Sequence, residues 1–91
     1  MKQLIFNFNL FDIEQKAMII DTEQNSPAAA YIIDNIDSAG ATIAKACSET
    51  GIFKIHLFGE PGYLNDLIIP EIKEHLFSMN YTIDNLEIEV N

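Results

Sequence analysis

The sequence predicts an α/β domain: a two-layer sandwich of order ββαβαβ, with a mixed four-stranded sheet and two helices packed on one face. Three observations predict it. Short segments with alternating apolar residues indicate strands, two longer segments with apolar residues every three to four positions indicate helices, and polar or glycine-containing stretches separate them. Because 91 residues build one hydrophobic core but not two, we expect a single domain over 1–91.

The first two expected strands form a hairpin. Residues 3–11 alternate between apolar and polar positions, residues 12–15 suit a loop, and residues 16–21 suit a returning strand. The first strand then has one apolar face, made of Leu4, Phe6, Phe8 and Leu10, and one mixed face, made of Gln3, Ile5, Asn7, Asn9 and Phe11.

The first expected helix begins at Ser26-Pro27, because serine is a common N-cap and proline is common at the first helical position. Gly51 would end it. Gly40 within it would permit close packing. An apolar stripe at helical spacing supports this helix: Ile32, Ile36, Ala39 or Gly40, Ile43 and Cys47. In an alternative interpretation, residues 29–34 form a strand and the helix starts at Asp37 or Ser38.

The remaining elements follow in order. Residues 52–58 suit a third strand with Phe53, Ile55 and Leu57 inward, and a second helix runs from about Gly62 to Met79. Pro70 lies inside this helix, where we expect a kink or a break. Residues 82–90 suit the last strand, with Leu86, Ile88 and Val90 inward and Glu87 and Glu89 outward.

This order predicts an open sheet face. Two right-handed crossovers that progress in one direction place both helices on the same face, make the last three strands parallel and leave the first strand antiparallel. The uncovered face would carry Ile5, Asn7, Asn9, Phe11, Lys54, His56, Phe58, Glu87 and Glu89. Such a mixture of apolar and polar side chains is typical of an interface. We therefore expect a small non-enzymatic module for protein–protein interaction or self-assembly, with Ile5, Asn7, Phe11, His56 and Phe58 in the interface.

The charge limits the partners. Fourteen acidic residues, five lysines and no arginine give a net charge of −9. Without arginine the chain lacks the bidentate contacts that dominate nucleic-acid recognition, so we expect a second copy or a protein partner, possibly a basic one. An inhibitor that mimics nucleic acid through its carboxylates is a further alternative. The short apolar runs, the absence of a signal-peptide pattern and the single Cys47 predict a cytoplasmic protein that does not bind a membrane.

The segment "FGEPGYLND" offers an alternative site of a different class. A strand followed by a glycine-containing loop and a helix is where open α/β sheets hold anionic ligands. Gly59, Gly62, Tyr63 and Asn65 would then surround a small anion in a binding or enzymatic domain. However, the segment lacks the phosphate-loop spacing, and Glu60 places a negative charge in it, so we interpret it first as a turn.

Other chemistry has weaker signals. His56 with Glu87 and Glu89 suggests a metal or acid–base site, but alternating glutamates on an outward strand face more often serve solvation. Cys47 has small apolar neighbours and is expected in the core. We therefore predict no catalytic residue, metal or cofactor.

Two short segments resemble known families. Asp37-Ser38-Ala39-Gly40 resembles the phospho-switch motif of STAS domains, which implies that Ser38 is phosphorylated. The chain departs from that family because only 36 residues precede the motif. The hairpin, the helix and the strand–turn "IHLFGEPGYL" resemble parts of the ribonuclease H/actin-like superfold. Asn7 and Asn9 stand where a nuclease would need a metal-binding carboxylate, so this resemblance does not imply nuclease activity.

Overall fold

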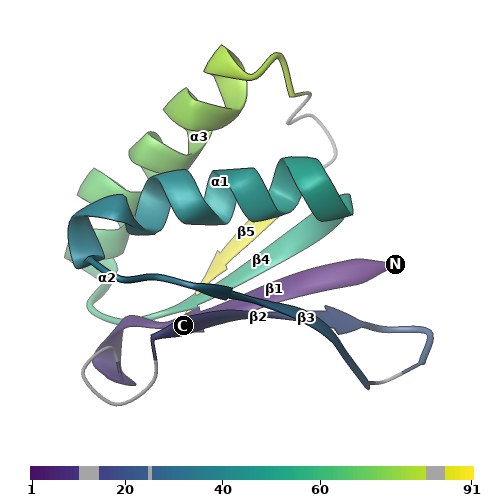
Figure 1. Ribbon diagram of the computed structural model, residues 1–91. Coiled ribbons are helices and arrows are strands. Elements are labelled where there is room, and N and C mark those ends of the chain that lie inside the picture. Colours follow the sequence, from purple (N-terminus) through teal and green to yellow (C-terminus); the bar gives the residue numbers. More distant parts are fainter. Residues whose placement is uncertain (11–14, 25, 82–85) are drawn as a thin grey trace.

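The structure is a computed structural model, and it describes residues 1–10, 15–24, 26–81 and 86–91. It consists of a five-stranded sheet with the helices on one side (Figure 1). The main elements in chain order are β1 (Lys2–Asn7), β2 (Lys16–Asp21), β3 (Ser26–Ile32), α1 (Ala39–Thr50), β4 (Ile52–Phe58), α2 (Pro61–Tyr63), α3 (Ile69–Ser78) and β5 (Glu87–Val90). The predicted α/β class is therefore confirmed, although the sheet has five strands rather than four.

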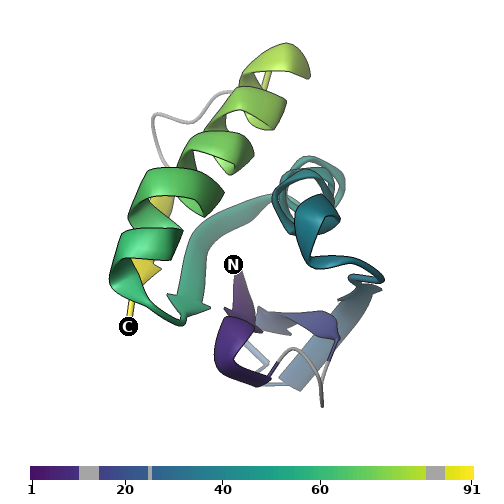
Figure 2. The ribbon, with the colours of Figure 1, turned by 90° about the vertical axis from the view of Figure 1, so that its left-hand side faces the viewer.

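The strand order is β3-β2-β1-β4-β5. Strand β2 pairs antiparallel with β1 and β3, whereas β1 with β4 and β4 with β5 are parallel pairs. The prediction that the first strand runs against the others was wrong, because a strand between the hairpin and α1 makes β2 the antiparallel one. Both longer helices pack against each other on one side of the sheet (Figures 1 and 2).

The extra strand replaces the first half of the predicted helix. Residues Ser26–Ile32 form β3, a 3₁₀ turn follows at Ile36–Ser38, and α1 begins at Ala39. A strand before a later helix, as in the alternative interpretation, is therefore observed, although the strand covers 26–32 rather than 29–34 and α1 begins one or two residues later than Asp37 or Ser38. Pro27 is compatible with β3 because this is an edge strand, where a missing N–H need not break the ladder. Asn35 caps the 3₁₀ turn, since its Oδ1 accepts the N–H of Asp37 at 2.9 Å.

Two strands differ in detail from their predictions. Strand β1 ends at Asn7, and Phe8–Leu10 form a 3₁₀ turn, because Asn7 Oδ1 accepts the N–H of Asn9 at 2.9 Å. In β4 the register with β1 shifts between Ile52 and Lys54, so Ile52 is buried and Phe53 only partly so. The predicted inward position of Phe53 was therefore wrong.

The second helix is continuous through Pro70. Residues Leu64–Ile68 form a π-helical segment between α2 and α3, in which the N–H of Ile69 donates to the C=O of Leu64. Because the α-helical bonding pattern is interrupted by this wider turn, the helix can continue without the N–H that Pro70 lacks. The predicted kink or break at Pro70 is thus a π segment instead. Asn80 follows the helix with φ 58°, as a left-handed terminator should.

The core lies between the sheet and the two longer helices. Its members are fully or almost fully buried, and the largest of them are Phe6, Leu4, Ile19, Ile33, Ile43, Ile55, Leu57, Leu64, Ile68, Ile72 and Leu76. Phe8 extends this core to Tyr63, with ring centroids 4.6 Å from Phe6 and 5.9 Å from Tyr63. Met79, predicted as the last residue of the second helix, follows the end of α3 at Ser78 and is 42% exposed.

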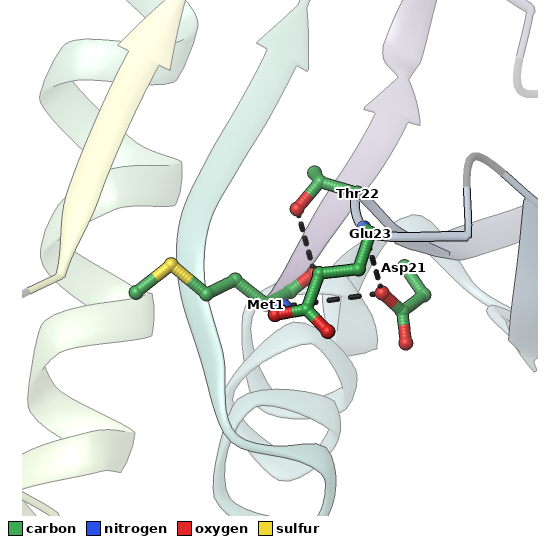
Figure 3. A network of polar contacts seen from close by, with 4 residues as sticks. All are labelled: Met1, Asp21, Thr22 and Glu23. Atoms are coloured by element: carbon green, nitrogen blue, oxygen red, sulfur yellow. Dashed lines mark hydrogen bonds and ion pairs between the residues drawn. The ribbon is translucent and has the colours of Figure 1, made fainter.

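The N-terminal end of β1 is tied to the turn after β2 (Figure 3). The backbone N–H and the hydroxyl of Thr22 both donate to the C=O of Met1, at 2.8 and 3.0 Å. The amino group of Met1 lies 3.8 Å from Asp21 Oδ1 and 3.5 Å from Glu23 Oε1. These contacts fix the register of the hairpin at the end remote from residues 11–14. Among the described residues, no helix combines the length and the apolar character needed to cross a membrane.

Candidate interface on the open sheet face

The sheet face opposite the helices is built from alternate residues of all five strands, and β3 adds Ile32 and Ala30, which pair with Lys16 and Met18. Since β4 lies between β1 and β5, the register aligns Met18, Ile5, His56 and Glu89 in one row across the sheet. The neighbouring row contains Ile20, Gln3, Lys54 and Glu87, and Asn7 pairs with Phe58 in a third. Within the described residues no helix covers this face (Figures 1 and 2).

A polar network occupies the half of this face over β4 and β5. His56 Nε2 lies 2.6 Å from Gln3 Oε1 on β1, and His56 Nδ1 lies 3.3 Å from Glu89 Oε2 on β5. Lys54 Nζ lies 3.1 Å from Glu89 Oε2 and 3.6 Å from Glu87 Oε2. The network therefore connects three strands and fixes both ring nitrogens of His56.

Lys54 is held in its charged form by this arrangement. Its pKa is raised, first by the hydrogen bond and the charge of Glu89 and secondarily by Glu87. Lysine is already protonated at neutral pH, so the raised pKa leaves its charge there unchanged. The consequence is geometric: two carboxylates share one ammonium group, and the side chains are ordered on the sheet surface.

The other half of the face, over β1 and β2, has a group of apolar side chains with Asn7 and Lys16 beside them. Ile5, Met18 and Ile20 are only partly buried, and Phe58 is partly exposed beside them on β4. A small hollow of about 70 Å³ lies among Ile5, Met18, Asn7 and Lys16. Partly exposed aliphatic and aromatic side chains on a regular surface are a feature of protein interfaces.

The face also differs from the whole molecule in charge. Its described charged groups are Lys16, Lys54, Glu87 and Glu89, which balance, whereas the chain carries −9. A neutral face on an acidic domain is where a second acidic molecule meets the least repulsion.

The structure brings together four of the five residues predicted for the interface. Ile5, Asn7, His56 and Phe58 all lie on this face, whereas Phe11 falls outside the described residues. Asn9 lies in the 3₁₀ turn and not on the sheet. The prediction missed Lys16, Met18 and Ile20, although the alternation of buried residues along β2 marks them as outward.

The predicted anion site at residues 59–66 is filled by the chain itself. Glu60 caps the helix: its two carboxylate oxygens accept the N–H groups of Gly62 at 3.1 Å and of Tyr63 at 2.7 Å. Because these are the amides that would bind an anion, a ligand would have to displace Glu60. Gly62 leaves room for the cap, since a Cβ there would lie 3.2 Å from both carboxylate oxygens. Asn65 is exposed on the next turn, and Gly59 packs against Phe8.

The remaining candidates are dispersed. Ser38 lies at the start of α1, not within a helix as the long stripe suggested, and its hydroxyl donates to the C=O of Asn35 at 2.8 Å. Cys47 is completely buried, and burial raises the pKa of its thiol to about 12. Within the described residues no group of three His, Cys, Asp or Glu side chains is arranged to hold a metal ion.

Comparisons of this chain with models of known families, with curated proteins and with solved structures find no significant match. The interface and ligand residues are therefore assessed only from their own chemistry.

Proposed function

We propose that this protein is a small non-enzymatic module that associates with a second copy of itself or with a protein partner through the open sheet face. The observation that carries the proposal is the surface formed by Ile5, Met18 and Phe58 beside the polar network of His56. Apolar side chains there supply the contact area, and the ordered polar side chains supply hydrogen bonds at its margin.

The geometry of the polar network supports a role in association rather than in solvation of the sheet surface. His56 and Lys54 have side chains that are only 20% and 26% exposed, and their partners come from two neighbouring strands. Because these long side chains are already ordered, less conformational entropy is lost when a partner binds.

The test is the oligomeric state and the partner binding of two matched variants. Phe58→Lys places a charge on the open face, and Phe77→Lys places the same charge on α3, where Phe77 is 82% exposed. Light scattering after size-exclusion chromatography, over a range of concentrations, should show self-association of the wild type. Pull-down from a lysate with the purified wild type and variants tests for binding to a protein other than a second copy.

We expect Phe58→Lys to abolish the complex and Phe77→Lys to preserve it. A monomer at every concentration that also captures no partner would contradict the proposal. Loss of the complex in Phe77→Lys but not in Phe58→Lys, with circular dichroism showing that both are folded, would place the interface on the helices instead.

The alternatives have less support. An anionic-ligand or enzymatic role at Gly59, Gly62, Tyr63 and Asn65 competes with the Glu60 cap. A nucleic-acid mimic needs acidic side chains on one face, whereas the described ones lie on the β2–β3 turn, before α1, on the helices and on β5. A STAS-like switch at Ser38 rests on the four-residue motif alone.

A further inference from the structure

Strand β5 forms one edge of the sheet, and part of its backbone groups have no partner strand among the described residues. Asn91, directly after it, donates its N–H to Leu57 at 2.9 Å and accepts the N–H of Gly59 at 3.4 Å. Since alternate residues of a strand direct both backbone groups to the same neighbour, Glu87 and Glu89 also bond toward β4. The N–H and C=O groups of Ile88 and Val90 therefore point away from β4, where no described strand pairs with them.

A groove accompanies this edge on the helix side. Asn65, Ile69 and Lys73 lie four residues apart along one side of the second helix, facing Leu86 and Ile88. The groove encloses about 320 Å³, which accommodates side chains of an added segment. Ile69, Leu86 and Ile88 supply its apolar lining, whereas Asn65 and Lys73 supply polar groups, and Lys73 is the cation among its lining residues.

The two sides of β5 have different chemistry. Glu87 and Glu89 lie on the open face and both contact Lys54, so negative charge is in excess locally at the β5 edge, although the face as a whole is neutral. Ile88 lies on the opposite side, in the groove. Pairing of β5 with β5 of a second copy would bring glutamates opposite glutamates, which is destabilising.

We propose that β5 accepts an extended segment of a partner protein with alternating basic and apolar residues, which extends the sheet by one strand. Its backbone bonds to the free groups of Ile88 and Val90. Its basic side chains face Glu87 and Glu89, and its apolar side chains enter the groove against Ile69, Leu86 and Ile88. Lys73 repels a basic side chain from the groove and so fixes which residues of the segment face inward.

This edge is separate from the interface proposed above. The open-face interaction uses the broad surface of β1, β2 and β4, whereas the added strand bonds to the outer edge of β5. The two proposals can therefore fail independently, and Phe58→Lys serves to separate them because it leaves the edge and the groove unchanged.

The test uses three synthetic peptides and amide NMR spectra of the full chain. The first peptide alternates lysine and valine, the second has the same composition with all lysines before all valines, and the third alternates glutamate and valine. We expect the first peptide to bind best, with the largest shifts and the greatest protection from hydrogen exchange at the amides of Ile88 and Val90. Phe58→Lys should bind it like the wild type.

Two variants test the mechanism. Val90→Pro removes an outward N–H without breaking a bond to β4, and should weaken binding of the first peptide about tenfold, which corresponds to the loss of one hydrogen bond. Glu87→Gln with Glu89→Gln should weaken it several-fold. The matched control is Asp34→Asn with Glu74→Gln, which removes the same charge at exposed positions away from β5. Equal binding of the first two peptides, equal effects of the two charge variants, or shifts confined to the open face would overturn the proposal.

Discussion

At the scale of single residues, Cys47 shows how burial determines reactivity. The side chain is completely buried and its pKa is raised to about 12, so the thiolate that reacts with alkylating agents is almost absent at neutral pH. We expect labelling by a thiol reagent to be at least about a hundredfold slower in the native protein than in denaturant, because it requires an opening of the structure. Equal rates in both conditions would show that α1 does not bury this residue.

The same pKa predicts a direction for alkaline stability. The native state holds the Cys47 proton more tightly than the unfolded chain, whose thiol has the ordinary pKa of 9.0. The unfolded state therefore loses its proton first, and the contribution of this group to stability is complete below pH 9 and falls between pH 9 and about 12. Denaturant titrations of the wild type and Cys47→Ala across this range measure it, and the wild type should lose more stability than the variant.

Glu60 is a second residue whose role is local. It accepts two backbone N–H groups at the start of the second helix, so Glu60→Ala should lower the free energy of unfolding by about 1 kcal/mol. Glu74→Ala, on the exposed side of α3, is the matched control and should change it by less than about 0.5 kcal/mol. Urea denaturation of both variants decides whether the cap contributes.

At the scale of elements, Gly40 sets the distance between α1 and α3. A Cβ on Gly40 would lie 2.8 Å from Glu71 Cβ, which belongs to the backbone-proximal part of the side chain and cannot move aside. We expect Gly40→Ala to destabilise the protein by about 1–3 kcal/mol despite the better helix propensity of alanine. Ala41→Gly, one position further along α1, is the comparison for propensity alone. A stabilising Gly40→Ala would contradict the close approach of the two helices.

The elements also show what the sequence could predict. Strands β2 and β4 were predicted with their observed bounds, because their polar or glycine boundaries coincide with the ends of alternating runs. Strand β3 was not predicted in this way, because Ser26-Pro27 suits the start of a helix and an edge strand equally. Only the pairing with β2 decides between the two. Likewise, alternation along the strands places four of the five residues predicted for the interface on the open face, whereas the contact of His56 with Glu89 depends on a strand order that no local pattern contains.

The π segment has a physical reason, which is found in the spacing of the buried residues along the second helix. Leu64, Ile68, Ile72 and Leu76 are buried and recur every four residues. On an ideal α-helix a step of four residues turns about 40° beyond a full turn, so such a stripe would rotate away from the core. The wider π turn at residues 64–68 offsets part of this rotation and keeps Leu64 buried. Pro70 therefore indicates from the sequence that the second helix is irregular, and the four-residue spacing of its buried side chains explains why the irregularity is a π turn.

At the scale of the whole molecule, the net charge of −9 opposes the compact state. Each described ion pair includes a group whose side chain is at least 46% exposed, so each contributes little attraction to offset this repulsion. Salt that screens charges beyond roughly 8–10 Å should therefore stabilise the fold, and we expect the Tm to rise by a few degrees between low salt and about 0.2 M sodium chloride.

The charge origin of this effect is separable from a general salt effect. Asp34→Asn with Glu74→Gln removes two negative charges from exposed positions, so this variant should have a higher Tm than the wild type at low salt and a smaller rise on adding salt. Thermal unfolding followed by circular dichroism, at a protein concentration where the chain is monomeric, measures both quantities. A Tm that falls with salt would mean that the Lys54 network and the Met1 contacts outweigh the repulsion between the remaining carboxylates.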